Sequence, residues 1–206
     1  MRAVALILYV LVSIAVFGAL SELQFGGSYL GRLALVLVLT FCATLVHELG
    51  HAAAARASGG QIKAIVVVPF RLQLKPRRFK LVPPRGAGDI GGYVTYTLDR
   101  INARSKHGLI AAAGPAANIL LAIIAGVIAL WLSSAPLAAG QAAGTLPPDS
   151  HMAAWLLRRQ LSDLAAALAT LSAGMAILNL VPFKGSDGDQ ILYALSARYR
   201  RRRSTS

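Results

Sequence analysis

Residues 33–55, LALVLVLTFCATLVHELGHAAAA, carry the strongest structural signal in the chain. The segment is apolar along most of its length, yet it contains His47, Glu48 and His51. An apolar segment of about 20 residues is long enough to span the hydrocarbon core of a bilayer. Ionisable side chains at that depth are costly, and they are typically retained where they serve a site. The segment therefore predicts a transmembrane helix that holds a functional group of polar residues.

Three further segments without any charged residue, 3–20, 108–132 and 164–183, predict three more transmembrane helices. The first competes with a signal peptide. We expect a retained helix, because its apolar run is longer than a usual signal segment and no clear cleavage pattern follows. The predicted fold class is mainly α: a polytopic membrane protein with four transmembrane helices at about 3–20, 33–55, 108–132 and 164–183.

The composition agrees with a membrane protein whose loops are basic. Of 206 residues 56% are hydrophobic and 14% are charged, and the net charge is +13. Eleven Lys and Arg residues lie within 56–106 and five Arg within 198–203. Because cytoplasmic loops carry the excess of Lys and Arg, both termini and the 56–106 connection are expected in the cytoplasm. The expected location is a bacterial inner or plasma membrane.

The connection at 61–100 reads as a small membrane-associated β-sheet. Short β-branched and alternating runs are separated there by prolines and glycines. The remaining connection at 133–150 is rich in Ala, Gly and Pro and is expected to be irregular. The chain is therefore one membrane-embedded domain, 1–206, ending in a basic cytoplasmic tail at 190–206. Arginines in that tail are expected to contact lipid headgroups rather than nucleic acid, since no basic and aromatic interleaving accompanies them.

His47-Glu48-Leu49-Gly50-His51 is an H-E-x-x-H sequence. Residues four apart lie on one face of a helix, so both imidazoles can bind one Zn²⁺, while the glutamate between them serves as a general base. A catalytic zinc site needs a third protein ligand and an open position. Glu48 is the last Glu in the chain, so the third ligand must be an Asp or another His.

Asp187 is the favoured third ligand. It follows the expected cytoplasmic exit of the last helix, on the same side of the membrane as His51, whereas Asp149, His151 and Asp163 are expected on the other side. Pro182 ends the helix before it, and Gly185 and Gly188 allow an irregular path around it. Whether Asp189 shares the metal stays open.

These residues resemble the site-2 protease family of intramembrane zinc metalloproteases, peptidase family M50, in a minimal form without a PDZ or CBS domain. The resemblance rests on the H-E-x-x-H sequence and on Asn179-x-x-Pro182-x-x-x-x-Asp187-Gly188, with weaker matches at Gly114-Pro115-Ala116-Ala117-Asn118 and at residues 91–94. It implies one Zn²⁺ held by His47, His51 and Asp187, with Glu48 as the catalytic general base.

The resemblance also implies residues that line the site. Asn118 and Asn179 would be polar residues that face the site and orient the substrate or its oxyanion. Gly91, Gly92 and Tyr93 would belong to a β element that pairs with an extended substrate strand. The implied function is hydrolysis of a peptide bond in or near the transmembrane segment of a single-pass membrane protein. Two alternatives are a non-catalytic pseudoprotease and a metal-ion transporter that uses the same ligands.

Overall fold

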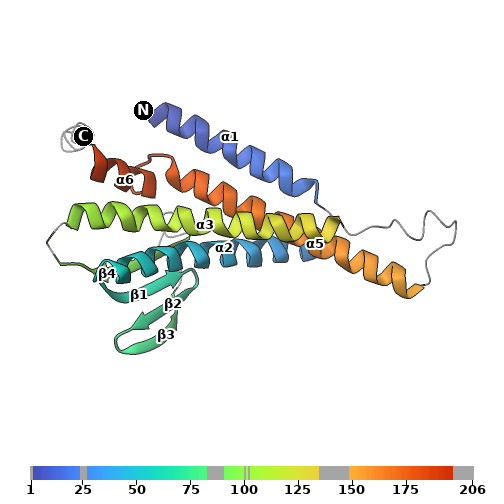
Figure 1. The fold of residues 1–206 in the computed structure, drawn as a ribbon, viewed down its shortest axis with the longest axis horizontal. Helices are drawn as coiled ribbons and strands as arrows, with labels where there is room; N and C mark the ends of the chain where they lie inside the picture. The colour runs from blue at the N-terminus through green and yellow to red at the C-terminus, as the bar shows by residue number, and fades with distance from the viewer. Residues whose placement is uncertain are drawn as a thin grey trace.

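The computed structural model describes residues 2–23, 27–82, 91–99, 101, 103–134 and 149–196. Long helices dominate it, and one small antiparallel sheet lies beside them (Figure 1). The elements in chain order are α1 (Arg2–Ser21), α2 (Tyr29–Ala57), β1 (Gln61–Val67), β2 (Phe70–Leu74), β3 (Arg77–Leu81), β4 (Gly92–Thr97), α3 (Ala103–Ser133), α5 (Asp149–Leu180) and α6 (Asp187–Leu195).

Three helices are long and apolar enough to cross a membrane, by length and composition: Tyr29–Ala57, Ala103–Ser133 and Trp155–Leu180. They contain the predicted spans at 33–55 and 108–132, and most of the span at 164–183. The predicted span at 3–20 forms helix α1, whose apolar part, Leu6–Ser21, is shorter than the other three. A mainly helical architecture, with three helices long and apolar enough to cross a membrane, is therefore confirmed, while the number of spans stays a prediction.

The helix boundaries differ from the expected spans, most of all at the start of α5. Residues 149–163 were expected in a connection, but they form the first half of α5, so that Arg158, Arg159 and Asp163 are helical. Helix α3 likewise begins at Ala103, before the expected start of its span at residue 108. Charged residues exclude a segment from the hydrocarbon core, but they do not end a helix, since Arg and Lys are good helix formers.

The C-terminal end of the described chain also differs. Residues 190–195 of the expected basic tail belong to α6, which packs against α3. The arginine cluster at 198–203 and residues 135–148 of the expected irregular connection lie outside the described residues.

The predicted sheet is present, with strand order β3-β2-β1-β4 and antiparallel pairing throughout. The turns that join β1 to β2 and β2 to β3 are two residues long, and each contains a cis proline, Pro69 and Pro76. Strand β4 pairs with β1 along one side only, so its other side is a free edge within the described sheet.

The β2–β3 hairpin has one largely apolar face and one largely basic face. Phe70 lies opposite Leu81 and Leu72 opposite Phe79, while Arg71 lies opposite Lys80 on the other face. Paired residues share a face of an antiparallel sheet. All four apolar side chains are exposed, and the Phe70 ring contacts Phe41 of α2, which is one of the candidate spans. An uncovered apolar face beside a membrane helix fits the predicted position of this sheet at the membrane surface.

Helix α3 lies at the centre of the bundle, where it contacts α2, α5 and α6 (Figure 1). Its contact with α2 depends on small residues. A Cβ atom at Gly50 would lie 2.6 Å from the Ala113 carbonyl oxygen and 2.8 Å from the Ala117 Cβ. Glycine and alanine let two helix backbones approach closely, as is common in membrane helix packing.

Gly50→Ala is therefore expected to force α2 and α3 apart and to destabilise the protein by about 1–3 kcal/mol, the usual cost of overpacking. Gly126→Ala is the matched control in α3, since the nearest atom to its Cβ would be 4.0 Å away. Thermal unfolding in detergent should show a lower melting temperature for Gly50→Ala and no decrease for Gly126→Ala. Equal melting temperatures would contradict the close-packing account.

Candidate metal centre and active site

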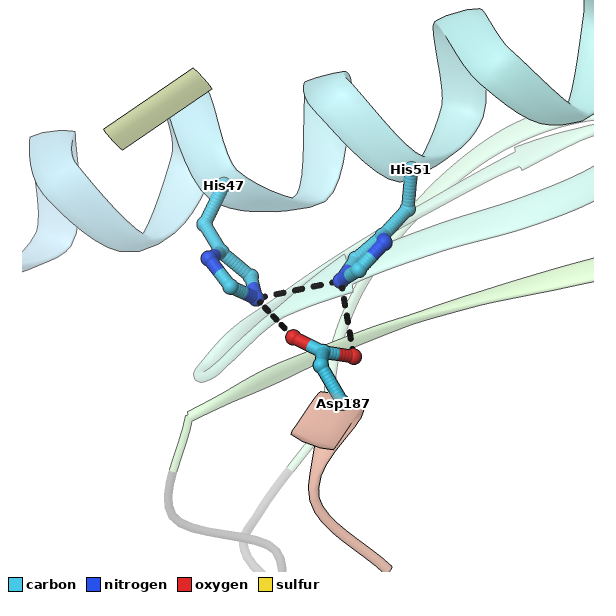
Figure 2. Close-up of side chains that lie close together, drawn as sticks. All are labelled: His47, His51 and Asp187. Atoms are coloured by element: carbon cyan, nitrogen blue, oxygen red, sulfur yellow. Dashed lines mark hydrogen bonds and ion pairs between the residues drawn. The ribbon is translucent and has the colours of Figure 1, made fainter. Parts of the chain in front are cut away.

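Three side chains from two distant parts of the chain meet at one end of the bundle. His47 and His51 come from successive turns of α2, and Asp187 is the first residue of α6 (Figure 2). Their ligand atoms lie within 4.8 Å of one another, and all three residues form a group that could hold a metal ion. His51 and Asp187 are far apart in the sequence. They meet because α3 and α5 return the chain to the end of the bundle where His51 lies.

The distances between the ligand atoms suit a tetrahedral zinc site. The Nε2 atoms of His47 and His51 are 3.0 Å apart, and Asp187 Oδ2 and Oδ1 lie 3.0 Å and 3.4 Å from them respectively. Two ligand atoms at usual zinc distances in a tetrahedron are about 3.3–3.4 Å apart. The two imidazoles and the carboxylate point toward one shared space, as Figure 2 shows.

Hydrogen bonding around His51 also fits a metal ligand. His51 Nδ1–H donates to the Ile110 carbonyl oxygen at 2.7 Å. A carbonyl oxygen only accepts, so in the neutral imidazole the proton is on Nδ1 and the lone pair of Nε2 faces His47 and Asp187. Metal-bound histidines characteristically donate their other ring N–H to an oxygen in this way. A lone pair directed at a carboxylate is unfavourable without a cation between them.

Because Gly114 of α3 has no side chain, the two imidazoles can occupy the space beside it. A Cβ atom at this position would collide with His51 Nε2 and would lie 2.7 Å from His47 Nε2. Only glycine lets α3 pack this closely against the ligand atoms. The weak Gly114-Pro115-Ala116-Ala117-Asn118 match in the sequence therefore has a steric role beside the ligands.

The loop between α5 and α6 sets the position of Asp187. Helix α5 ends at Leu180, and Pro182 has no N–H with which to continue it. Gly185 adopts φ +94°, a conformation that side chains rarely adopt. Ser186 caps α6 by accepting a hydrogen bond from the Asp189 N–H, while its hydroxyl donates to the Val181 carbonyl. Asp187 thus enters the site from a fixed helix start.

The environment keeps Asp187 ionised. Burial raises the pKa of its carboxyl, but the neighbouring imidazoles of His47 and His51 outweigh burial and hold the pKa below its ordinary value. Nearby, burial and the negative charge of Asp187 raise the pKa of the Tyr96 hydroxyl, whose oxygen lies 2.8 Å from His107 Nδ1. The site thus pairs a charged carboxylate ligand with a neutral phenol at its edge.

Glu48 lies at the junction of two cavities. One, of about 270 Å³, is lined by the three candidate ligands, by Glu48 and by strand β4. The other, of about 570 Å³, extends from His47 and Glu48 between helices α1, α2 and α5 and has mostly apolar walls. The Glu48 carboxylate is buried, and its Oε2 has no hydrogen-bond partner among the described residues. A buried carboxylate oxygen without a partner is available to accept a proton.

The predicted lining residues fall into two groups. Asn179 and Gly92 line both cavities, Tyr93 lines the smaller one and Gly91 the larger one. Gly92 packs closely against Glu48, the candidate general base. A Cβ atom at Gly92 would lie 2.6 Å from Glu48 Cγ. Asn118 differs from the expectation, because it is completely buried behind His47 and lines neither cavity.

Asp189 and His107 lie outside the ligand group of the described residues. Asp189 Oδ2 accepts a hydrogen bond from the Gly185 N–H, so that it stabilises the loop before α6. Sequence reasoning did not single out Tyr96, Gln190 or the Ile110 carbonyl, all of which border the smaller cavity. Alternation along β4 places Tyr96 on the same face as Gly92 and Val94, and this was the signal that could have found it.

Searches of the curated proteins and of the solved structures find no match. A family model described as Peptidase family M50 matches residues 34–206, a range that contains the three candidate ligands, Glu48, the sheet and helices α3, α5 and α6. M50 peptidases are membrane metallopeptidases that use zinc. The match covers most of the chain, and the chain therefore belongs to peptidase family M50, the site-2 protease family.

Proposed function

We propose that this protein is an intramembrane zinc endopeptidase that hydrolyses a peptide bond in or near the transmembrane segment of another membrane protein. The observation that carries the proposal is the convergence of His47, His51 and Asp187 beside the buried Glu48. Two imidazoles and one carboxylate are a typical donor set for a catalytic zinc, which keeps its fourth position open. His47, His51 and Asp187 would hold the ion.

Zinc bound at such a site supplies a Lewis acid that polarises a carbonyl and makes water acidic near neutral pH. Glu48 performs the proton transfers. Its carboxylate accepts a proton from the attacking water and delivers it to the amine of the leaving peptide, the role of a general base that then acts as a general acid. The burial of Glu48 next to the candidate ligands supports this assignment.

Strand β4 is the proposed holder of the substrate. A peptide bond inside a transmembrane helix is protected by the helical hydrogen bonds, so the substrate must be locally extended before hydrolysis. An extended peptide added at the free edge of β4, at residues 91–94, would gain backbone hydrogen bonds and pass next to Glu48. The apolar cavity would receive substrate side chains, and Asn179, at the wall shared by both cavities, would orient the substrate backbone.

The proposed topology has four transmembrane helices, α1 included, and both termini in the cytoplasm of a bacterial cell. It is supported by the basic residues in 56–106 and 198–203. Under this topology His51 and Asp187 lie near the cytoplasmic surface, where water can reach the smaller cavity. The expected substrate is a single-pass membrane protein.

Glu48→Gln is expected to retain zinc and to reduce cleavage about 10²- to 10⁴-fold, the usual contribution of general acid–base catalysis. The assay uses purified full-length protein in detergent and a panel of single-pass transmembrane peptides with a fluorophore and quencher. Metal content is measured on the same samples. Undiminished cleavage by the variant, or loss of its zinc, would refute the role assigned to Glu48.

Asp187→Asn is expected to weaken zinc binding by more than about 100-fold, since changes outside the ligand shell alone cost 10- to 100-fold. Asp189→Asn is the matched control: it removes a neighbouring buried carboxylate that is outside the ligand group, and zinc should remain stoichiometric. Titration of zinc against a competing chelator measures the zinc affinity of both variants.

The same protein distinguishes the two alternative functions. Wild-type protein that binds zinc but cleaves no peptide favours the pseudoprotease, and zinc movement across vesicle membranes favours the transporter.

A further inference from the structure

Asn118 has a polar side chain, but this side chain does not border the cavities that could hold a substrate. It lies in the middle of α3, its exposed fraction is 0%, and it borders neither cavity. Its Nδ2 is 3.3 Å from His47 Nδ1, and its Oδ1 has no hydrogen-bond partner among the described residues. Burial of an amide in a membrane helix requires that its polar atoms be satisfied, so the side chain needs another explanation.

The two orientations of the amide have different consequences for His47. If Nδ2 donates to His47 Nδ1, the neutral imidazole carries its proton on Nε2, pointing toward His51 and Asp187, and Oδ1 stays unpaired. If the Asn118 amide is rotated by 180°, so that Oδ1 and Nδ2 exchange places, Oδ1 accepts the Nδ1–H of His47. The Nε2 lone pair of His47 then faces Asp187. Each orientation leaves one end of the amide without a partner among the described residues, Oδ1 in the first and Nδ2 in the second. The second orientation alone leaves the Nε2 lone pair of His47 free to bind a cation.

The same helix performs the equivalent task for the second histidine. Ile110, Gly114 and Asn118 are spaced four residues apart and so lie on one face of α3. The Ile110 carbonyl accepts from His51 Nδ1, Gly114 leaves room for both imidazoles, and Asn118 lies against His47 Nδ1. One face of a single helix therefore contacts both histidines.

We propose that Asn118 is a positioning residue that accepts the Nδ1–H of His47 through Oδ1, fixing the ring orientation and presenting Nε2 to the metal. This inference rests on the proposed zinc site. It replaces the substrate-orienting role expected from the sequence with a role toward the ligand. Partners of this kind raise the basicity of a metal-bound imidazole, and their loss typically weakens metal binding about 10- to 100-fold.

The test compares Asn118→Leu, which keeps the size but removes the acceptor, with Asn118→Asp, which keeps an acceptor at the same position. Zinc affinity of the purified full-length protein in detergent is measured by chelator competition, and unfolding temperature on the same samples. Asn118→Leu should bind zinc about 10- to 100-fold more weakly. Asn118→Asp should bind it as tightly as the wild type or more tightly. Ser172→Ala, which removes a buried hydroxyl that lines neither cavity, should bind zinc normally.

Nuclear magnetic resonance gives a readout that needs no substitution. In zinc-loaded wild-type protein labelled with [¹⁵N]histidine, His47 Nδ1 should carry the directly bonded proton. Zinc binding with an unprotonated His47 Nδ1, unchanged affinity in Asn118→Leu, or equal losses in Asn118→Leu and Asn118→Asp would each overturn the inference while leaving the zinc site intact. Wild-type protein that binds no zinc would overturn the proposed function, and the inference with it.

Discussion

The contact of Asp187 with His47 and His51 is the constraint around which the rest of the molecule is arranged. It joins the C-terminal half of α2 to the start of α6, and these groups are buried in a chain that is otherwise largely apolar. Under the proposed function, a cation shared by the three groups stabilises them together in this apolar surrounding. Helix α3 makes this geometry possible, since its small residues bring its backbone against the imidazoles.

Much of this arrangement was predictable because the strongest signals in the sequence are local. The spacing of His47, Glu48 and His51 places three groups on adjacent positions of one helix, and that spacing needs no tertiary information. Asp187 could be predicted because the expected topology of the spans left few carboxylates on the same side of the membrane as His51. The sheet was predictable from β-branched runs separated by proline and glycine, and its four strands are present.

The remaining features depend on tertiary contacts that local patterns do not encode. The charges at Arg158 and Arg159 indicate where hydrocarbon ends, but α5 continues through them because helix propensity is independent of the membrane. Asn118 was expected to face the substrate, since a motif shows that a polar residue is needed but not which side of the helix it faces. The rotation of α3 about its axis, fixed by Gly50 and Gly114 against α2, directs Asn118 to His47 instead.

The order of the ligands along the chain has a consequence for biosynthesis. Two ligands belong to α2, and the third follows α5, so a nascent chain that has been translated only as far as α5 contains an incomplete coordination set. Such a chain holds both imidazoles and Glu48 but lacks the carboxylate that would secure the ion. Under the proposed function, hydrolytic competence arises only after the last long helix has been inserted, and the ribosome-bound intermediate cannot attack neighbouring proteins at the insertion machinery.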